Sequence, residues 1–234
     1  MAKQKTQVTT VAKGEVKIGL RSGGVVVITP EAVDVSQVAL NDLAYGLANI
    51  PRFSGQLDRP YSVGEHSIVL SELCTTYDQK ISALFHDAAE TLGIGDVNTF
   101  LKTEDLKDVE TRITDAVFKK FRIPEFTEHA LDKSLGNHEA CTFHPAKVHF
   151  GTAPDLRPNY RHYRSISDCA EKWNSLYQCY LDSREFAQTP LDIKGPFSLG
   201  ELYMKYPGIL PQAVDDAMKI SNATLVRGDI YVIQ

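Results

Sequence analysis

The stretch ALFHDAAETLGIGD, residues 83–96, decides how this chain is interpreted. It opens with three apolar residues, as a buried helix does. It then places His86, Asp87 and Glu90 where a core helix would carry more apolar side chains. Residues three and four apart share one face of a helix, so Glu90 lies on the same side as both His86 and Asp87. Neighbouring carboxylates are costly to remove from water unless a positive charge lies among them.

A divalent metal ion would supply that positive charge. Imidazole and carboxylate together suit zinc, manganese, iron or cobalt. The alternative for the same residues is a partly exposed helix end with a solvated acidic patch. An HD dipeptide alone does not separate the two interpretations.

The composition is that of a globular protein large enough to form a substantial core. Of the 234 residues, 43% are hydrophobic and 24% are charged, which is ordinary for globular domains, and the net charge of −5 argues against a general nucleic-acid binder. No apolar run approaches the roughly 20 residues that span a bilayer, and the N-terminus MAKQKTQVTT lacks the apolar core of a secretory signal. The four cysteines form no CxxC pair, so we expect reduced thiols in a cytoplasmic protein.

Hydrophobic periodicity predicts a series of helices between residues 37 and 187. Ser62 and Glu65 form an S-x-x-E capping box, which predicts that a helix starts there. The segment 144–165 contains three prolines and is predicted to be a loop. The other helices are predicted at about 37–50, 78–92, 106–121, 125–143 and 167–187.

The two ends of the chain have a different character. Residues 1–14 are polar and predicted to be frayed, and EVKIGL and VVVI, joined by RSGG, predict a β-hairpin. After Pro190 we expect two short helices and two short strands around an R-G-D turn. This appendage could be a winged-helix DNA reader, which Asp215 and Asp216 on its second helix argue against. It could also serve packing or oligomerisation, and share one small sheet with the N-terminal hairpin.

Two further residues could join the quoted stretch. His66 lies in an apolar stripe four residues after Ser62, and Asp132 lies in EHALDKSLGNHEA with Leu135 and Glu139 on the same face. Taken singly, His66 is typical of a buried core histidine and Asp132 of a surface aspartate. With the HD pair, however, they place four candidate ligands on three successive helical segments, where they could converge on one metal.

The order H…HD…D resembles the metal site of the HD-domain phosphohydrolases. The segments RFSGQLDRPYSVGEHS, HDAAETLGIGDVNTFLK and DKSLGNHEA are similar to those of its small deoxynucleotide-cleaving branch, which includes the 5′-deoxynucleotidases and the phage dATP triphosphohydrolases. The resemblance covers roughly residues 25–145, with a looser helical similarity to about residue 187. The segment after residue 190 has no counterpart in this pattern.

The resemblance implies an all-α fold. Residues 1–189 would form an HD-domain helical bundle with its core at about 37–187 and a short N-terminal β-hairpin, and residues 190–234 a small α+β appendage of unknown role. A divalent transition metal (zinc, cobalt or manganese) would be bound by His66, His86, Asp87 and Asp132. Glu90 and Asp96 would be the catalytic acids that orient the attacking water and accept its proton. Asp96 stands one residue later than in the nucleotidase pattern, and its alternative role is to cap a loop.

The same resemblance implies three substrate-binding residues. Arg52 matches the arginine that holds the phosphate next to the sugar, and Lys102 matches a lysine of the triphosphate-cleaving relatives. Phe53 stands where the nucleotidases have an aromatic residue beside the sugar. The alternatives are surface positions for Arg52 and Lys102 and core packing for Phe53. His129 and Lys133 lie near Asp132 and could contact distal phosphates, but we predict exposed positions for both. We leave His138, His144, His149 and His162 outside the site.

Three functions stay open at this point. The resemblance favours hydrolysis of dATP to deoxyadenosine and triphosphate, because Lys102 extends the basic side chains beyond the first phosphate. Removal of phosphate from deoxynucleoside monophosphates would use the same metal. A non-catalytic nucleotide-sensing module belongs to another class, and the presence of Glu90 argues against it. We expect a small-molecule deoxynucleotide as partner, with no nucleic acid and no membrane, and a homo-oligomer.

Overall fold

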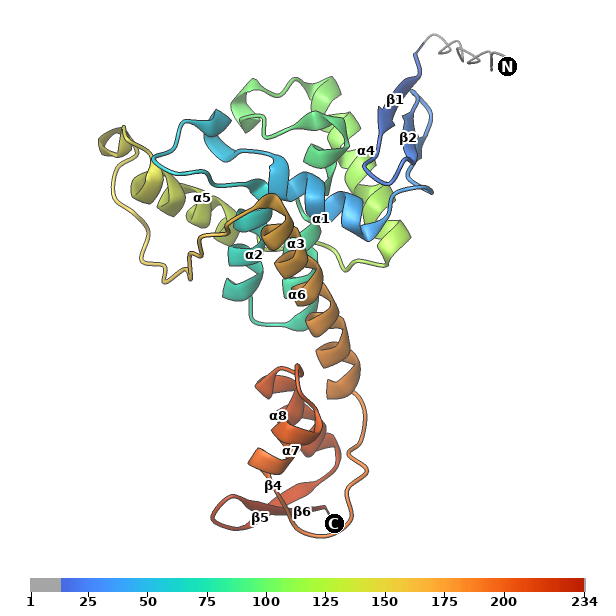
Figure 1. The fold of residues 1–234 in the computed structure, drawn as a ribbon, viewed down its shortest axis with the longest axis vertical. Helices are drawn as coiled ribbons and strands as arrows, with labels where there is room; N and C mark the ends of the chain where they lie inside the picture. The colour runs from blue at the N-terminus through green and yellow to red at the C-terminus, as the bar shows by residue number, and fades with distance from the viewer. Residues whose placement is uncertain (1–13, 234) are drawn as a thin grey trace, which may run out of the picture.

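A computed structural model describes residues 14–233, so the prediction that the first residues are frayed falls almost wholly outside the described part of the chain. The described residues are mostly helical, with eight α-helices and two small three-stranded sheets. Figure 1 shows a helical body from which the longest helix leads to a smaller C-terminal unit. In this range no helix combines the length and the apolarity that crossing a bilayer requires.

Four helices form the centre of the body: α1 (Leu40–Asn49), α2 (Val63–Leu73), α3 (Tyr77–Phe85) and α6 (Ile166–Ala187). Trp173 of α6 is fully buried, and its indole N–H donates to the carbonyl of Leu84 at 3.1 Å. The ring of Phe85 lies 4.8 Å from that of Trp173. Gly64 lets α1 and α2 approach closely, because a Cβ there would lie 2.8 Å from the backbone nitrogen of Ala48.

Two further helices flank this centre: α4 (Glu104–Phe121) and α5 (His129–Phe143). Near the end of α4, the Lys120 ammonium donates to three backbone carbonyls of the segment that precedes α1, those of Val35, Ser36 and Val38. This contact ties α4 to the N-terminal sheet. Leu135 of α5 packs in a separate apolar cluster with residues of α2 and α3, which holds the start of α5 over those helices.

The N-terminal hairpin is confirmed and gains a third strand. Its strands run antiparallel in the order β1 (Val16–Gly19), β2 (Val25–Ile28) and β3 (Val33–Asp34). The side chain of Ile18 lies against Gly93, where a Cβ would come within 2.5 Å of the Ile18 Cδ1. Gly93 has a φ of 108°, so glycine suits both the conformation and the close approach. The sheet therefore covers the segment that follows Glu90.

The C-terminal unit has its own apolar cluster and its own sheet. Its elements are β4 (Phe197–Ser198), α7 (Leu199–Lys205), α8 (Pro211–Ile220), β5 (Ala223–Arg227) and β6 (Ile230–Ile233), with strand order β4-β6-β5. The idea of one sheet shared with the N-terminal hairpin is therefore wrong, because the two sheets are separate. The two short helices and two short strands predicted after Pro190 are present, and β4 is added to them. Helix α8 packs against α6, and its acidic residues lie close enough to Tyr77 to add to the effect of burial, which raises the pKa of that phenol to about 12.

Several predicted helix boundaries differ from the structure. The helix of residues 78–92 ends at Phe85, and a separate π-helical turn, Glu90–Ile94, follows it. Helix α1 begins at Leu40 rather than 37, and α5 begins at His129 rather than 125. Helix α6 begins at Ile166 rather than 167 and is capped by Ser165, whose hydroxyl accepts from the Asp168 N–H. The Ser62 cap forms, but the Glu65 side chain pairs with Arg59 at 3.0 Å instead of returning to the cap.

Candidate metal centre

Three of the four predicted ligands, His66, His86 and Asp132, meet at one place in the helical body, and Asp87 lies beside them. His66 lies on the first turns of α2, His86 and Asp87 follow α3, and Asp132 lies on the first turn of α5. His66 Nε2 is 2.9 Å from Asp132 Oδ1, and His86 Nε2 is 3.7 Å from the same oxygen. Asp87 Oδ2 lies 3.0 Å from His86 Nε2. One ligand atom each from His66, His86 and Asp132 falls within a span of 4.8 Å.

These distances fit the ligands of a single transition-metal ion. Metal–nitrogen and metal–oxygen bonds of about 2.1 Å place neighbouring ligand atoms about 3.0–3.4 Å apart. His86 Nδ1 lies 2.8 Å from the carbonyl oxygen of Ala83, a contact in which Nδ1 carries a proton, so that in the neutral imidazole Nε2 offers its lone pair. That Nε2 atom is buried and faces the carboxylates of Asp87 and Asp132. The donor set therefore fits a divalent cation.

Protons on the imidazoles balance the carboxylates in the protein alone. Burial disfavours a charged His86, but Asp87 and Asp132 outweigh it and hold the pKa of His86 well above its usual value. The pKa of Asp132 lies below its usual value because hydrogen bonds from His66 and His86 overcome the effect of burial. Binding of a cation would displace these protons, since metal ligands must be deprotonated.

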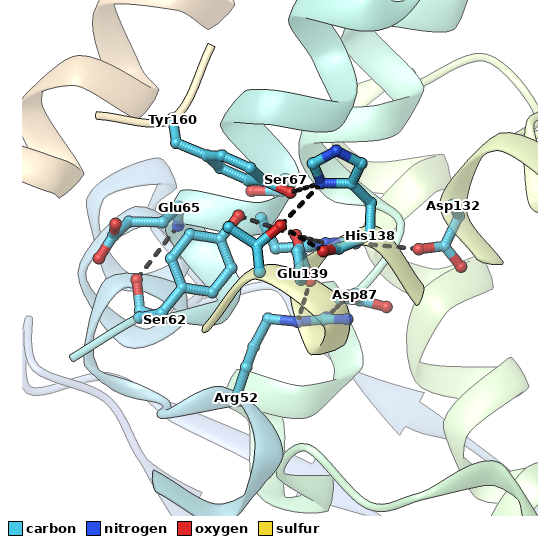
Figure 2. A network of polar contacts seen from close by, with 12 residues as sticks. Arg52, Ser62, Glu65, Ser67, Asp87, Asp132, His138, Glu139 and Tyr160 are labelled. Carbon is cyan, nitrogen blue, oxygen red and sulfur yellow. Dashed lines mark hydrogen bonds and ion pairs between the residues drawn. The ribbon is translucent and has the colours of Figure 1, made fainter. Parts of the chain in front are cut away.

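Glu139 supports this site and was not among the predicted residues. Its side chain is fully buried on α5. Oε1 lies 2.8 Å from His66 Nδ1 and accepts the Tyr61 hydroxyl at 2.8 Å, while Oε2 lies 3.1 Å from Arg52 Nε. Figure 2 shows Glu139 at the centre of these contacts, with Arg52 on one side. A carboxylate behind a ligating histidine fixes its ring and tautomer. The sequence signal was available, because Glu139 lies two helical turns after Asp132 on the same face.

Arg52 lies next to the ligands rather than on the surface. Its side chain is 13% exposed and its Nη1 lies 3.8 Å from Asp87 Oδ2. Burial opposes the charge, but Glu139 and Asp87 together raise the pKa of Arg52 further above its usual value. The guanidinium thus stays charged between two carboxylates, and its position suits an anion held beside the metal ligands.

The turn that carries Arg52 is strained. Phe53 and Ser54 both adopt left-handed backbone conformations, with φ of 52° and 53°, which cost about 1–2 kcal/mol per residue outside glycine. The Phe53 N–H donates to Asp96 Oδ2 at 2.9 Å. Asp96 therefore holds the Arg52–Gly55 turn in place, which agrees with the loop-capping role. Strained residues cluster at functional sites, where the surrounding structure enforces them.

Glu90 is a buried carboxylate with an unused acceptor. Its Oε2 makes no hydrogen bond within the described residues. Burial, together with the charges of Asp87 and Asp96, raises its pKa to about 9. Lys102 partly opposes this shift through its own charge. The Lys102 side chain is only 9% exposed and pairs with Glu110 at 2.5 Å, so it points inward instead of into solvent.

Aromatic side chains surround the site, and the sequence did not reveal most of them. Phe126 stacks on His86 at 4.8 Å. His144 lies edge-on to Phe53 at 6.4 Å, although it was left outside the site. His138 Nδ1 lies 2.8 Å from the Tyr160 hydroxyl, and both appear in the network of Figure 2. His129 and Lys133 are exposed, as predicted.

Comparisons with known proteins give relatives without an established function. No family model matches the chain. It is 32% identical over 96 residues to the uncharacterized protein YfdR of Escherichia coli, a match that covers 40% of this chain and 53% of YfdR. It is 33% identical over 119 residues to an uncharacterized protein of Rhodobacter capsulatus, which covers 46% of this chain and 59% of that protein. The chain thus spans between half and two thirds of the length of these relatives.

Proposed function

We propose that this protein is a metal-dependent phosphohydrolase of the HD-domain type that cleaves deoxynucleotides. The observation that carries the proposal is the meeting of two histidines and one aspartate from three helical segments, with Asp87 and Arg52 beside them and a buried glutamate whose Oε2 has no hydrogen-bond partner in the described residues. Zinc, manganese and cobalt all accept such ligands.

The residues of the site have different roles in the proposed hydrolysis. A divalent cation at His66, His86, Asp87 and Asp132 would supply Lewis-acid activation of the water and of the phosphate. Arg52 binds the phosphate next to the sugar, since a guanidinium offers two parallel donors to phosphate oxygens. The oxygen of water forms a bond to phosphorus while the bond from phosphorus to the 5′ oxygen of the sugar breaks.

We assign Glu90 as the general base that accepts a proton from the attacking water. It is buried one helical turn from the HD pair, and within residues 14–233 its Oε2 has no hydrogen-bond partner. Without a cation its raised pKa keeps Glu90 protonated near neutral pH; the positive charge of a bound divalent cation would lower this pKa and leave the carboxylate ionised. The water must lose a proton as it attacks, and the ionised carboxylate accepts it. Asp96 acts on the turn that carries Arg52 and Phe53 through its hydrogen bond to the Phe53 N–H.

The first choice of substrate is dATP, with deoxyadenosine and triphosphate as products. Lys102 supports this choice because its ammonium is drawn inward and lies within electrostatic reach of Glu90. The second candidate is a deoxynucleoside monophosphate. It is favoured by the ion pair of Lys102 with Glu110, which already neutralises the lysine that a longer phosphate chain would need.

Incubation of the metal-loaded protein with dATP and with dAMP, followed by ³¹P NMR, tests the proposal. We expect inorganic triphosphate from dATP. Orthophosphate from dAMP, with dATP unchanged, would move the assignment to the monophosphate candidate. If the protein holds zinc, manganese or cobalt and hydrolyses neither compound, the proposal is wrong and a nucleotide-sensing role takes its place.

A further inference from the structure

Three aromatic side chains from separate segments form a wall beside Arg52. The Phe53 ring centroid is 5.6 Å from the Arg52 Cζ, the His144 ring is 6.4 Å from that of Phe53, and the Phe150 ring is 5.0 Å from that of His144. We call Phe53, His144 and Phe150 the aromatic wall. It runs from the Arg52–Gly55 turn to the end of α5 and the short turn Lys147–His149 that follows.

The wall carries one hydrogen-bond donor of known position. The backbone N–H of Ala146 donates to His144 Nδ1 at 3.0 Å, so that nitrogen is an acceptor. In the neutral imidazole the proton then resides on Nε2, which becomes a donor. In the described part of the chain this Nε2 has no hydrogen-bond partner.

The wall is not closed off as a hydrophobic core would be. Phe150 is 44% exposed, and the neighbouring Val148 is 81% exposed. Phe53 is half-buried and its position is fixed, because its left-handed backbone is held by Asp96. The rings meet edge to face, at 69° between Phe53 and His144 and at 62° between His144 and Phe150, so they do not form one flat surface. The exposed ring of Phe150 beside a single free donor is suited to an aromatic ring that carries acceptors on its edge.

We propose that the aromatic wall binds the base of the substrate, and that it favours purine over pyrimidine deoxynucleotides. This inference rests on the proposed function, since it places the base next to the arginine that holds the phosphate. The base stacks on the exposed ring of Phe150, and the His144 Nε2–H donates to an acceptor on the edge of the base. Purines gain more because their two fused rings cover more of the Phe150 ring.

The test compares a nucleotide with its base-free counterpart. We would measure by calorimetry the binding of dAMP, dCMP and 2-deoxyribose 5-phosphate to the metal-loaded Glu90→Gln protein, which needs no turnover. We expect tighter binding of dAMP than of dCMP. Phe150→Ala, added to this protein, should weaken dAMP binding about tenfold and leave binding of 2-deoxyribose 5-phosphate unchanged.

Two further variants separate stacking from hydrogen bonding. His144→Phe keeps a ring in the wall but loses the donor, so it should weaken dAMP binding less than Phe150→Ala does. His149→Ala, on the exposed neighbouring turn, is the matched control and should change nothing. Three results would each contradict the proposal that the aromatic wall binds the base. They are an equal loss of affinity for dAMP and for 2-deoxyribose 5-phosphate, an unchanged affinity for dAMP in Phe150→Ala, and no binding of dAMP at all. If the wild-type protein hydrolyses the nucleotide and the wall variants have no effect, the base-binding proposal fails and the proposed function stands. If nucleotide binding depends on the wall but no hydrolysis occurs, the base-binding proposal stands and the proposed function fails.

Discussion

The candidate metal centre and the C-terminal unit both carry acidic residues on helices, but they differ in whether these residues are buried or exposed to solvent. In the metal centre Glu90 and Glu139 are buried, and a nearby turn is strained. In the C-terminal unit Asp215 is exposed on α8, and the buried face of that helix is wholly apolar. Buried carboxylates cost stability unless they are paired. The candidate metal centre therefore retains charges that folding alone does not require, which supports its choice as the candidate functional region.

The largest effect should come from Glu90→Gln. Glutamine keeps the shape of the side chain but cannot accept the proton of the attacking water. We expect turnover to fall by about 10²–10⁴-fold, while metal content and nucleotide binding persist, because His86 and Asp87 are unchanged. Turnover, metal content and nucleotide affinity are measured on one preparation.

Asp215→Asn is the control for that comparison, because it removes an exposed carboxylate from the C-terminal unit. Its turnover should equal that of the wild-type protein. If Glu90→Gln also kept the wild-type rate, Glu90 would be a positioning residue and Asp96 would become the candidate for the base.

A smaller effect is expected for Glu139→Gln, which tests whether a residue behind the ligands matters. The amide can still contact Tyr61 but no longer holds His66 and Arg52 by charge. Loss of such support costs about 10–100-fold in metal affinity. A metal titration monitored by calorimetry measures it, with the exposed Glu104→Gln on α4 as control. Equal affinity in both variants would show that Glu139 serves the fold alone.

The smallest effect concerns the strained turn. Ser54 is exposed and has a φ of 53°, which glycine adopts without a steric penalty. Relief of the strain in Ser54→Gly should raise the free energy of unfolding by about 1 kcal/mol. The greater conformational freedom of glycine in the unfolded chain reduces this gain. Chemical denaturation measures the change. A loss of stability would indicate that this conformation is not strained in the protein.

Local signals predicted much of the helical body. Ser62 starts α2 as its side chain indicates, and α6 buries Trp173 and Tyr177 at the expected spacing. The end of α3 could not be predicted in this way, because apolar residues continue to Leu92 at helical spacing. The chain leaves the α-helix there through a wider turn, in which the Gly95 N–H donates to the Glu90 carbonyl, and the distant Ile18 packs against this turn.

The candidate site was likewise predictable only in part. The four candidate ligands were proposed from a resemblance in their order, and the structure places His66, His86 and Asp132 together with Asp87 beside them. Glu139 shares a helix face with Asp132, which the sequence indicates, but its contact with His66 and the contact of His144 with Phe53 join residues about 70 and 90 positions apart in the chain. Such contacts depend on how helices pack, and no linear spacing records them.

Metal content of the wild-type protein and of Asp87→Asn tests the central claim most directly. Asn keeps the size of the side chain but replaces a charged ligand oxygen by a neutral amide. After incubation with zinc, manganese or cobalt and dialysis, we expect about one ion per chain in the wild-type protein and in the Asp215→Asn control, and severe loss in Asp87→Asn. The added metal should raise the melting temperature only where it is retained. Metal at the wild-type level in folded Asp87→Asn would contradict the assignment of these four residues as the metal centre.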